Sequence, residues 1–278
     1  MNQPSYIFNK SEDQPERDRL KLIERYHDPR TRERLQQVGI SAKGTCLEVG
    51  PGAGSIMRWM ARIVGPQGHV MAIELNPRFL SRNSPPHLTL IQGDINKVPL
   101  PSKTFQVAHA RFTLIHTPSH QRALKKIIEA LRPGGWLVLE EPDFSVARVV
   151  TGPKGLGRSV QRVNEAIQHM FSNAGLDPAF GVKLPGLLQD MGLVNLTVDN
   201  DTPLVQGGSP MATIMKLSAH QLAERYLATG RVTKTDLTRY VRFAEDPDSW
   251  AVYHATVAVM AQKKPRGGST KTKGLAKQ

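Results

Sequence analysis

The central part of the chain alternates short apolar runs with amphipathic segments. Five apolar runs, each bounded by glycine, proline or polar residues, occupy residues 45–49, 69–73, 88–91, 105–109 and 136–140. Runs of this length and composition are typical of buried strands. Segments with apolar residues at helical spacing lie among them at 55–64 and 121–131. The alternation predicts an α/β fold with parallel strands and helices on both faces of the sheet.

The N-terminal segment is dense in charges. Residues 17–25 and 30–38 carry apolar positions at helical spacing, and Asp28-Pro29 stands between them. This pattern predicts two amphipathic helices that meet at the proline. We expect residues 1–38 to form a helical cap.

The pattern after Asp143 is looser but still favours defined elements. Helices are predicted over 156–174, 183–191, 211–229 and 233–245, and strands over 193–198 and 250–261. The helical pair before the last strand indicates an insertion at about 200–248 that caps a site. No linker separates an independent second domain, so residues 39–262 are expected to form one domain.

Composition narrows the cellular setting. No apolar run approaches the roughly 18 residues that a membrane span needs, and the first ten residues do not resemble a signal peptide, so we expect a cytoplasmic protein. The net charge is +13, and residues 263–278 contain six Lys or Arg and no acid. This tail is expected to be disordered; it is either a weak contact for nucleic acid or a membrane surface, or a solvated segment without a role. Cys46 is the one cysteine, so a cysteine-based metal cluster is excluded, and no His, Asp or Glu cluster has metal-ligand spacing.

The strongest chemical signal is Glu48-Val-Gly-Pro-Gly-Ala-Gly54, where the first predicted strand ends and a helix begins. Glycines permit a tight turn and let the backbone approach a ligand, and the N–H groups of the helix start point toward it. Nicotinamide and flavin enzymes share such turns. Their Gly-x-Gly-x-x-Gly pattern would put the third glycine at Ser55, and no Tyr-x-x-x-Lys pair of the short-chain dehydrogenases is present.

Two acids follow the next two strands. Glu74 closes the second strand, where a carboxylate can accept hydrogen bonds from both ribose hydroxyls of a nucleoside. Asp94, in Gly93-Asp94-Ile95, follows the third strand and could face an adenine amino group. Each acid has a simpler interpretation, Glu74 as a solvated strand end and Asp94 as a turn or cap residue.

Together these segments resemble the class I methyltransferases that use S-adenosylmethionine. Four segments carry the resemblance: Glu48–Gly54, Ile73–Leu75, Gly93–Ile95 and Leu131–Val138. It implies a Rossmann-like, mostly parallel sheet of seven strands whose seventh strand is antiparallel. It also implies that the Gly-rich turn holds the methionine moiety, Glu74 the ribose, and Asp94 and Ile95 the adenine. The predicted cofactor-binding residues are Tyr6, Arg19, Glu48, Gly50, Gly52, Gly54, Glu74, Leu75, Asp94, Ile95 and Arg111; Tyr6 and Arg19 resemble those of a small-molecule subgroup whose N-terminal helices cover the cofactor.

The acceptor is less well defined. His116 is a candidate general base because its ordinary pKa suits proton removal near neutral pH; the simpler interpretation is a packed or capping histidine. Glu141, with Glu140 and Asp143, could act as a base, attract a cationic amine, or be an edge acid. The helix over 211–229 could form a lid over an apolar acceptor or be ordinary packing.

We therefore expect methyl transfer to an oxygen or nitrogen of a small, largely apolar metabolite. Alternatives are methylation of protein or RNA, or cofactor binding without transfer. The Asn/Asp-Pro-Pro-aromatic tetrad of enzymes that methylate base amines is absent after the fourth strand, so a nucleic-acid acceptor is not expected. The oligomeric state is not indicated.

Overall fold

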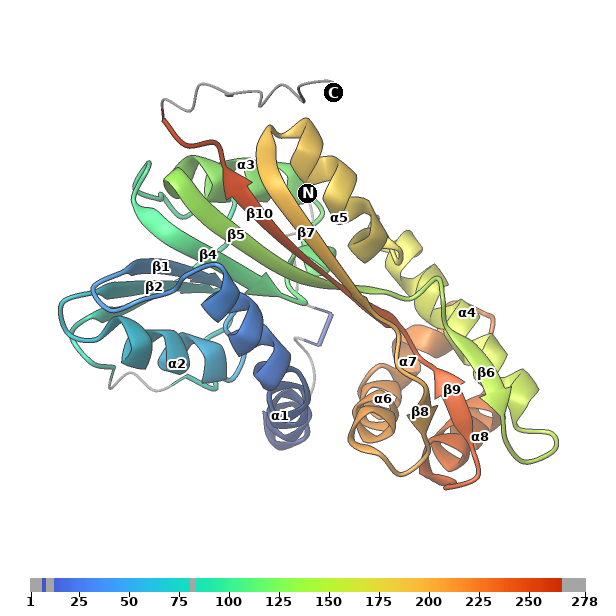
Figure 1. Cartoon of the computed structure of the whole chain (residues 1–278). Helices are drawn as coiled ribbons and strands as arrows, with labels where there is room; N and C mark the ends of the chain where they lie inside the picture. Colours follow the sequence, from blue (N-terminus) through green and yellow to red (C-terminus); the bar gives the residue numbers. More distant parts are fainter. Residues whose placement is uncertain (1–6, 9–12, 81–83, 267–278) are drawn as a thin grey trace, which may run out of the picture.

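The computed structural model describes residues 7–8, 13–80 and 84–266. Its main feature is a seven-stranded sheet in the order β3-β2-β1-β4-β5-β10-β7 (Figure 1). The strands are β1 (Thr45–Val49), β2 (His69–Glu74), β3 (Leu88–Gln92), β4 (Phe105–Arg111), β5 (Leu131–Asp143), β7 (Leu193–Asp201) and β10 (Ala255–Lys263). β1 to β5 run parallel, and β10 is antiparallel to both of its neighbours. The predicted Rossmann-like class I methyltransferase fold is confirmed, including the direction of the last strand.

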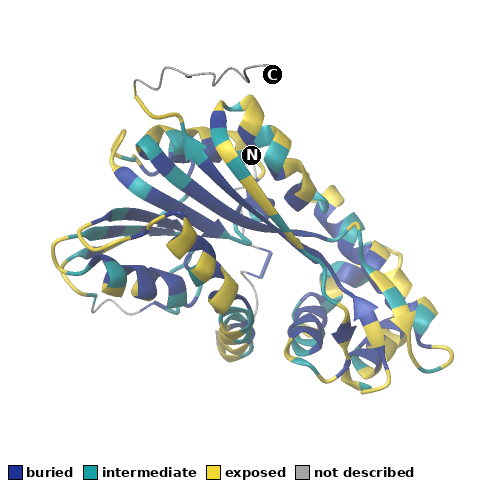
Figure 2. Ribbon diagram, viewed as in Figure 1, coloured by how far each residue is buried: buried dark blue, intermediate teal, exposed yellow. Residues whose placement is uncertain are grey.

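Helices cover both faces of this sheet. α2 (Ser55–Val64) packs on one face, and α3 (His120–Ala130) and α5 (Phe180–Asp190) lie on the other (Figure 1). The core accordingly has two apolar clusters, one around α2 and a larger one that reaches α3, α5 and the C-terminal helices. The central strands β1, β4, β5 and β10 are buried along most of their length, whereas the edge strands β3 and β7 are largely exposed or half-buried, as Figure 2 shows for β7. A parallel sheet covered in this way needs strands that are apolar on both sides.

The N-terminal segment differs from the prediction. One helix, α1 (Asp13–Gln37), runs through Pro29 where two helices were expected. Proline costs the helix one backbone hydrogen bond, because it lacks an N–H. On both sides of Pro29 the helix is held by buried contacts to the sheet: Asp28 binds Arg111, and Thr31 binds Glu140. These tertiary contacts outweigh the local preference of the proline.

A second lobe stands beside the sheet. It contains α4 (Gly157–Asn173), α6 (Pro210–Gln221), α7 (Ala223–Leu227) and α8 (Lys234–Glu245), together with a small antiparallel sheet in the order β6-β9-β8. These short strands are β6 (Arg148–Thr151), β8 (Val205–Gln206) and β9 (Trp250–Val252). Figure 1 shows the long strands of the main sheet running directly into this lobe. The lobe therefore draws on residues before α5 as well as on the predicted insertion.

The end of the described chain is part of the fold. β10 runs to Lys263, the residue at which the predicted tail begins. The Lys263 ammonium donates hydrogen bonds to the carbonyls of Ile128 and Leu131, at 2.6 and 2.7 Å, where α3 ends. A cation suits the free carbonyls of a helix C-terminus. Among the described residues, none of the helices combines the length and apolar character that crossing a bilayer requires.

Candidate functional site

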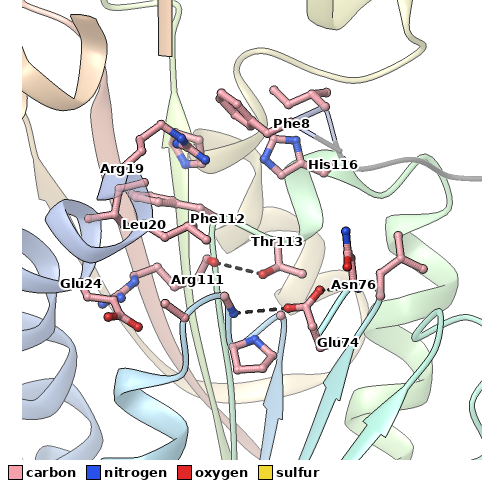
Figure 3. A pocket seen from close by; sticks show the side chains of 18 of the residues that line it. Phe8, Arg19, Leu20, Glu24, Glu74, Asn76, Arg111, Phe112, Thr113 and His116 are labelled. Atoms are coloured by element: carbon pink, nitrogen blue, oxygen red, sulfur yellow. Dashed lines mark hydrogen bonds between the residues drawn. The ribbon is translucent and has the colours of Figure 1, made fainter. Parts of the chain in front are cut away.

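A cavity of about 240 Å³ opens at the carboxyl ends of β1 to β5. α1 and Phe8 cover it on one side, and α4, α6 and α7 close it on the side of the second lobe. Figure 3 shows side chains from α1, the Gly-rich turn and the strand ends pointing toward the same space. Ligands of open α/β sheets bind at this edge, so the fold itself places a site here.

The Gly-rich turn forms the floor of the cavity. At Gly50 the backbone φ is +71°, and a Cβ atom would lie 2.2 Å from the Thr113 hydroxyl, so only glycine fits. Gly54, with a φ of +90°, begins α2. The next backbone N–H, that of Ser55, donates to the Glu24 carboxylate at 2.8 Å. The turn is thus held open toward the cavity, while α1 caps the helix that follows it.

The predicted nucleoside residues meet at one end of the cavity. Glu74 accepts hydrogen bonds from the backbone N–H groups of Gly52, at 3.3 Å, and Asn76, at 3.0 Å. Burial raises the pKa of Glu74, and these two donors oppose the shift. Asp94 holds its own turn by accepting from the N–H of Asn96 at 2.8 Å. Glu74 and Asp94 line the same space.

Apolar side chains complete this end. Leu75, Phe79 and Ile95 line the cavity beside the two carboxylates. Carboxylates for ribose hydroxyls, apolar walls for a flat base and an open Gly-rich backbone are the features that an adenine nucleoside needs. The residues present therefore fit S-adenosylmethionine.

Three other predicted cofactor residues line the cavity but already have partners. Arg19 forms a bidentate, buried ion pair with Glu16, at 2.8 and 2.9 Å, and its guanidinium lies 3.6 Å from the Phe8 ring centroid. Glu48 accepts a hydrogen bond from His109. Arg111 is bound by Asp28 and Thr31, at 3.0 and 2.8 Å. Tyr6 lies outside the described residues.

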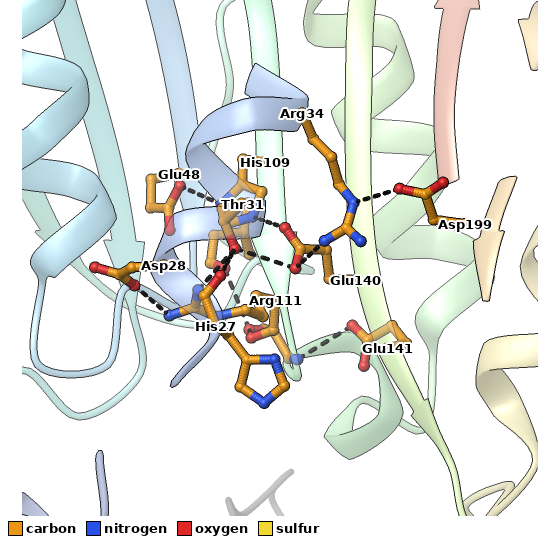
Figure 4. Close-up of polar contacts among 12 residues, drawn as sticks. His27, Asp28, Thr31, Arg34, Glu48, His109, Arg111, Glu140, Glu141 and Asp199 are labelled. Atoms are coloured by element: carbon orange, nitrogen blue, oxygen red, sulfur yellow. Dashed lines mark hydrogen bonds and ion pairs between the residues drawn. The ribbon is translucent and has the colours of Figure 1, made fainter. Parts of the chain in front are cut away.

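A buried ionic chain lies beneath the Gly-rich turn (Figure 4). His109 Nδ1 is 2.8 Å from Glu48, and its Nε2 is 3.4 Å from Glu140. Burial disfavours the charged imidazole, but the two carboxylates outweigh it and raise the pKa of His109 to about 9. Burial likewise opposes ionisation of Glu140, yet His109, Arg111 and Arg34 lower its pKa to about 2. Buried charges of this kind are stable only when each lies beside a charge of opposite sign.

The same chain fastens α1 to the sheet. Arg34 donates to Glu140 and to Asp199, both at 3.1 Å, and thereby joins α1 to β5 and β7. Near the cavity, Asp28 accepts from the Ser55 hydroxyl at 3.0 Å. α1 therefore belongs to the wall of the cofactor site.

The two predicted catalytic residues lie in different surroundings. His116 lines the cavity, where burial lowers its pKa to about 3, so the ring is neutral and a weak base. Glu141 is fully buried and is not among the lining residues. Its carboxylate turns back to accept the N–H groups that begin the short 3-10 helix η1 (Leu114–His116), at 3.1 Å from Thr113 and 2.7 Å from Leu114. Burial raises the pKa of Glu141 to about 8, against these donors. The three acids at the end of β5, Glu140, Glu141 and Asp143, do not line the cavity, in contrast to the expectation that they could meet the acceptor.

The far end of the cavity is apolar and partly unforeseen. Met211, Met215, Leu222 and Tyr226 of the segment 211–229 line it, whereas Leu217 of that segment does not. The four lining residues are also buried in the core, so they both pack the lobe and face the cavity. Sequence reasoning missed a set of aromatic rings beside them: His27, Phe112, Phe144, Phe171 and His254. These residues come from α1, the end of β4, the end of β5, α4 and the start of β10, so only the fold brings them together. The one local signal is the aromatic or histidine residue that follows several of the strands.

Known proteins resemble this chain in both sequence and fold. Residues 47–139 match a family model described as a methyltransferase domain. Methyltransferase str3 of Strobilurus tenacellus is 30% identical over 165 residues, 56% of this chain and 55% of that protein. The ubiquinone/menaquinone biosynthesis C-methyltransferase UbiE of Ectopseudomonas mendocina is 28% identical over 115 residues, 38% of this chain and 45% of that protein. The chain thus spans about half the length of these curated relatives.

A solved structure has a similar fold. The phosphoethanolamine N-methyltransferase 2 of Haemonchus contortus, bound to phosphomonomethylethanolamine and S-adenosylhomocysteine, has a TM-score of 0.61 with 14% identity. The match covers 96% of this chain and 61% of that one, and it shows a shared fold. The motifs, the family model and this fold agree: residues 47–139 form a methyltransferase domain, within a chain that has the fold of the class I methyltransferases.

Proposed function

We propose that this protein transfers a methyl group from S-adenosylmethionine to an oxygen or nitrogen atom of a small, largely apolar metabolite. The observation that carries the proposal is the continuity of the cavity. Glu74 and Asp94 stand at one end, Met211 and Phe171 stand at the other, and all four line one cavity. A bound cofactor and a small acceptor would therefore share one continuous space.

The lining of the acceptor end supports an apolar substrate. Its side chains beyond residue 141 include no Asp, Glu, Lys or Arg among the described residues. They are Pro142, Phe144, Ile167, Phe171, Met211, Ile214, Met215, Ser218, Leu222, Tyr226 and His254. Burying a charged acceptor here would cost several kcal/mol per ion without a partner, on the order of the usual desolvation penalty.

The contribution of the chain to catalysis is mainly positioning. The sulfonium of the cofactor supplies an already activated methyl group, so alignment of the acceptor accounts for most of the rate. The Gly-rich turn would hold the methionine moiety, Glu74 the ribose hydroxyls, and Asp94 with Ile95 the adenine. α1, fastened by Arg34 and Asp28, keeps this end closed.

The alternatives predict different outcomes in a transfer assay. The protein would be incubated with methyl-labelled S-adenosylmethionine and, separately, with panels of small apolar alcohols and amines, a cell protein extract and total RNA. We expect label to enter compounds of the small-molecule panel. Label found only in protein or RNA would show that the acceptor is a macromolecule and would replace the proposal. Tight cofactor binding without any transfer would favour a protein that binds the cofactor but is not an enzyme. The name of UbiE specifies a carbon acceptor, so the labelled product should be analysed for the methylated atom.

A further inference from the structure

A belt of three histidine and three phenylalanine rings lines the acceptor end of the cavity. In spatial order it consists of His27, Phe112, His254, Phe144, Phe171 and His116. Adjacent ring centroids are 4.9 to 5.9 Å apart, and every member lines the cavity. Rings at such distances form favourable edge-to-face and stacked pairs, and they offer the same geometry to a flat guest.

Phe112 is held in this belt against its backbone preference. Its φ is +51°, in the left-handed region that a bulky residue rarely adopts. The Phe112 N–H donates to the carbonyl of Glu140 at 2.8 Å, which fixes the strained turn at the end of β4. As a result the Phe112 ring stands over the cavity between His27 and His254 (Figure 3). Strain that the surrounding structure maintains is characteristic of functional positions.

The belt is electrically neutral near neutral pH. Burial lowers the pKa of His27 and of His254, and it lowers the pKa of His116 to about 3. Around His254 the Ala255 carbonyl and the carboxylates of Asp143 and Asp201 oppose the shift. Arg111 and His254 reinforce it at His27, and Arg19 reinforces it at His116.

His254 is the belt residue whose hydrogen bonding fixes its tautomer. Its Nδ1 is 3.1 Å from the carbonyl oxygen of Ala255, and a carbonyl can only accept, so Nδ1 carries the proton. In the neutral ring Nε2 then has a lone pair. No described residue provides Nε2 with a hydrogen-bond donor. The cavity side of His254 therefore presents an acceptor between the rings of Phe112 and Phe144.

We propose, resting on the function above, that the acceptor is a planar aromatic alcohol that packs in the belt with its hydroxyl at Nε2 of His254. The hydroxyl would donate its proton to Nε2 while its oxygen forms the bond to the transferred methyl carbon. The carbon–sulfur bond of the sulfonium breaks, and its electron pair remains on sulfur as a thioether. Asp143 and Asp201 stabilise the resulting imidazolium, which releases the proton to water.

The test is calorimetry on the full chain saturated with S-adenosylhomocysteine. The probes are 2-naphthol, its saturated analogue decahydro-2-naphthol, and naphthalene. We expect 2-naphthol to bind about tenfold more tightly than decahydro-2-naphthol, because ring pairing is lost in the saturated analogue. H254N keeps a donor for the Ala255 carbonyl but lacks Nε2. It should weaken 2-naphthol about fivefold and leave naphthalene unchanged.

Control variants at residues outside the cavity test whether the changes in affinity are specific to the belt. His220 is an exposed histidine of the second lobe, so H220N should bind all three probes as the wild type does. F144L should reduce the preference for 2-naphthol over its saturated analogue. F243L, at a buried phenylalanine outside the cavity, should not.

The outcomes distinguish this inference from the proposed function. Failure to bind S-adenosylhomocysteine would remove the proposed function itself. Binding of the nucleoside with equal affinity for the aromatic and saturated probes, or with affinity for neither, would overturn the aromatic acceptor alone. Unchanged 2-naphthol affinity in H254N would overturn the role of His254.

Discussion

The ionic chain beneath the Gly-rich turn makes a quantitative prediction about stability and pH. His109 has its pKa raised from 6.5 to about 9 in the folded protein, against the opposing effect of burial, by Glu48 and Glu140. The shift corresponds to about 3 kcal/mol at roughly 1.4 kcal/mol per pKa unit. Because the folded state holds this proton more tightly, the stabilisation is complete below pH 6.5 and is lost as the pH rises to 9.

The perturbation is H109Q, whose side-chain amide keeps one N–H donor group for the neighbouring carboxylates but cannot carry a charge. We expect the free energy of unfolding of the wild type to exceed that of H109Q most at pH 6, and the difference to shrink by about 3 kcal/mol by pH 9.5. Glu141, with its pKa raised to about 8, destabilises both proteins over part of the same range, so its effect cancels in the difference. The difference reports on His109 together with Glu140, whose pKa His109 lowers. Urea denaturation at closely spaced pH values, with linear extrapolation, gives both curves.

Two results bear on the reasoning. H220Q, which removes an exposed histidine, should follow the wild-type curve. A constant gap between the wild type and H109Q from pH 6 to 9.5 would show that His109 is neutral in the folded protein. In that case the account of the ionic chain would be wrong.

Three further predictions concern the cofactor end and the chain terminus. Glu74→Ala should weaken S-adenosylmethionine binding by roughly 1.5–3 kcal/mol, as for lost charge-assisted hydrogen bonds, and unchanged affinity by calorimetry would refute its assignment to the ribose. Gly50→Ala should destabilise the protein by about 2 kcal/mol more than Gly230→Ala, because both have similar positive φ but only Gly50 faces Thr113. Equal losses in thermal unfolding would show that the Thr113 contact relaxes. Deleting residues 267–278 should leave transfer to a small acceptor intact, and a collapse of turnover in the truncated protein would show that the tail has a role. Lys263→Met should lower the free energy of unfolding by about 1 kcal/mol, because it removes the hydrogen bonds to the end of α3.

The sequence predicted the sheet well because its strands are apolar runs cut off by turn residues. The predicted strands at 45–49 and 69–73 match β1 and β2 to within one residue. In contrast, β8 has two residues and β9 has three, too few for any alternation to register. The predicted strand over 250–261 is divided at Tyr253-His254, where the chain passes from the small sheet to the main one. This division depends on the positions of the two sheets, which the local sequence pattern does not show.

The candidate site was predictable only where the chemistry is local. Gly50, Gly52 and Gly54 are adjacent in sequence, and Glu74 and Asp94 close successive strands, so spacing alone placed them at one edge. The local sequence pattern indicates only that His109 lies in a strand, because its partners Glu48 and Glu140 are 61 and 31 positions away in the sequence. Pairing the predicted strands would have revealed it: Glu48 is the direct neighbour of His109 in the β1–β4 register. A titratable residue within each of three apolar neighbouring strands indicates a buried ionic chain.

The aromatic belt had no comparable signal. His27 and His254 are more than two hundred positions apart, and both meet Phe112 only because α1 and the start of β10 converge on the end of β4. The positive φ of Phe112 that aims its ring is likewise a tertiary feature, held by a hydrogen bond to Glu140. Residues whose roles depend on such convergence require the structure.

The central claim, a site for the sulfur nucleoside at the carboxyl edge of the sheet, is tested most directly by titration calorimetry with S-adenosylmethionine, S-adenosylhomocysteine and NAD. The account predicts micromolar binding of both sulfur nucleosides, no binding of NAD, and weaker binding of both nucleosides to Glu74→Ala. Binding of NAD, or of neither sulfur nucleoside, would contradict it.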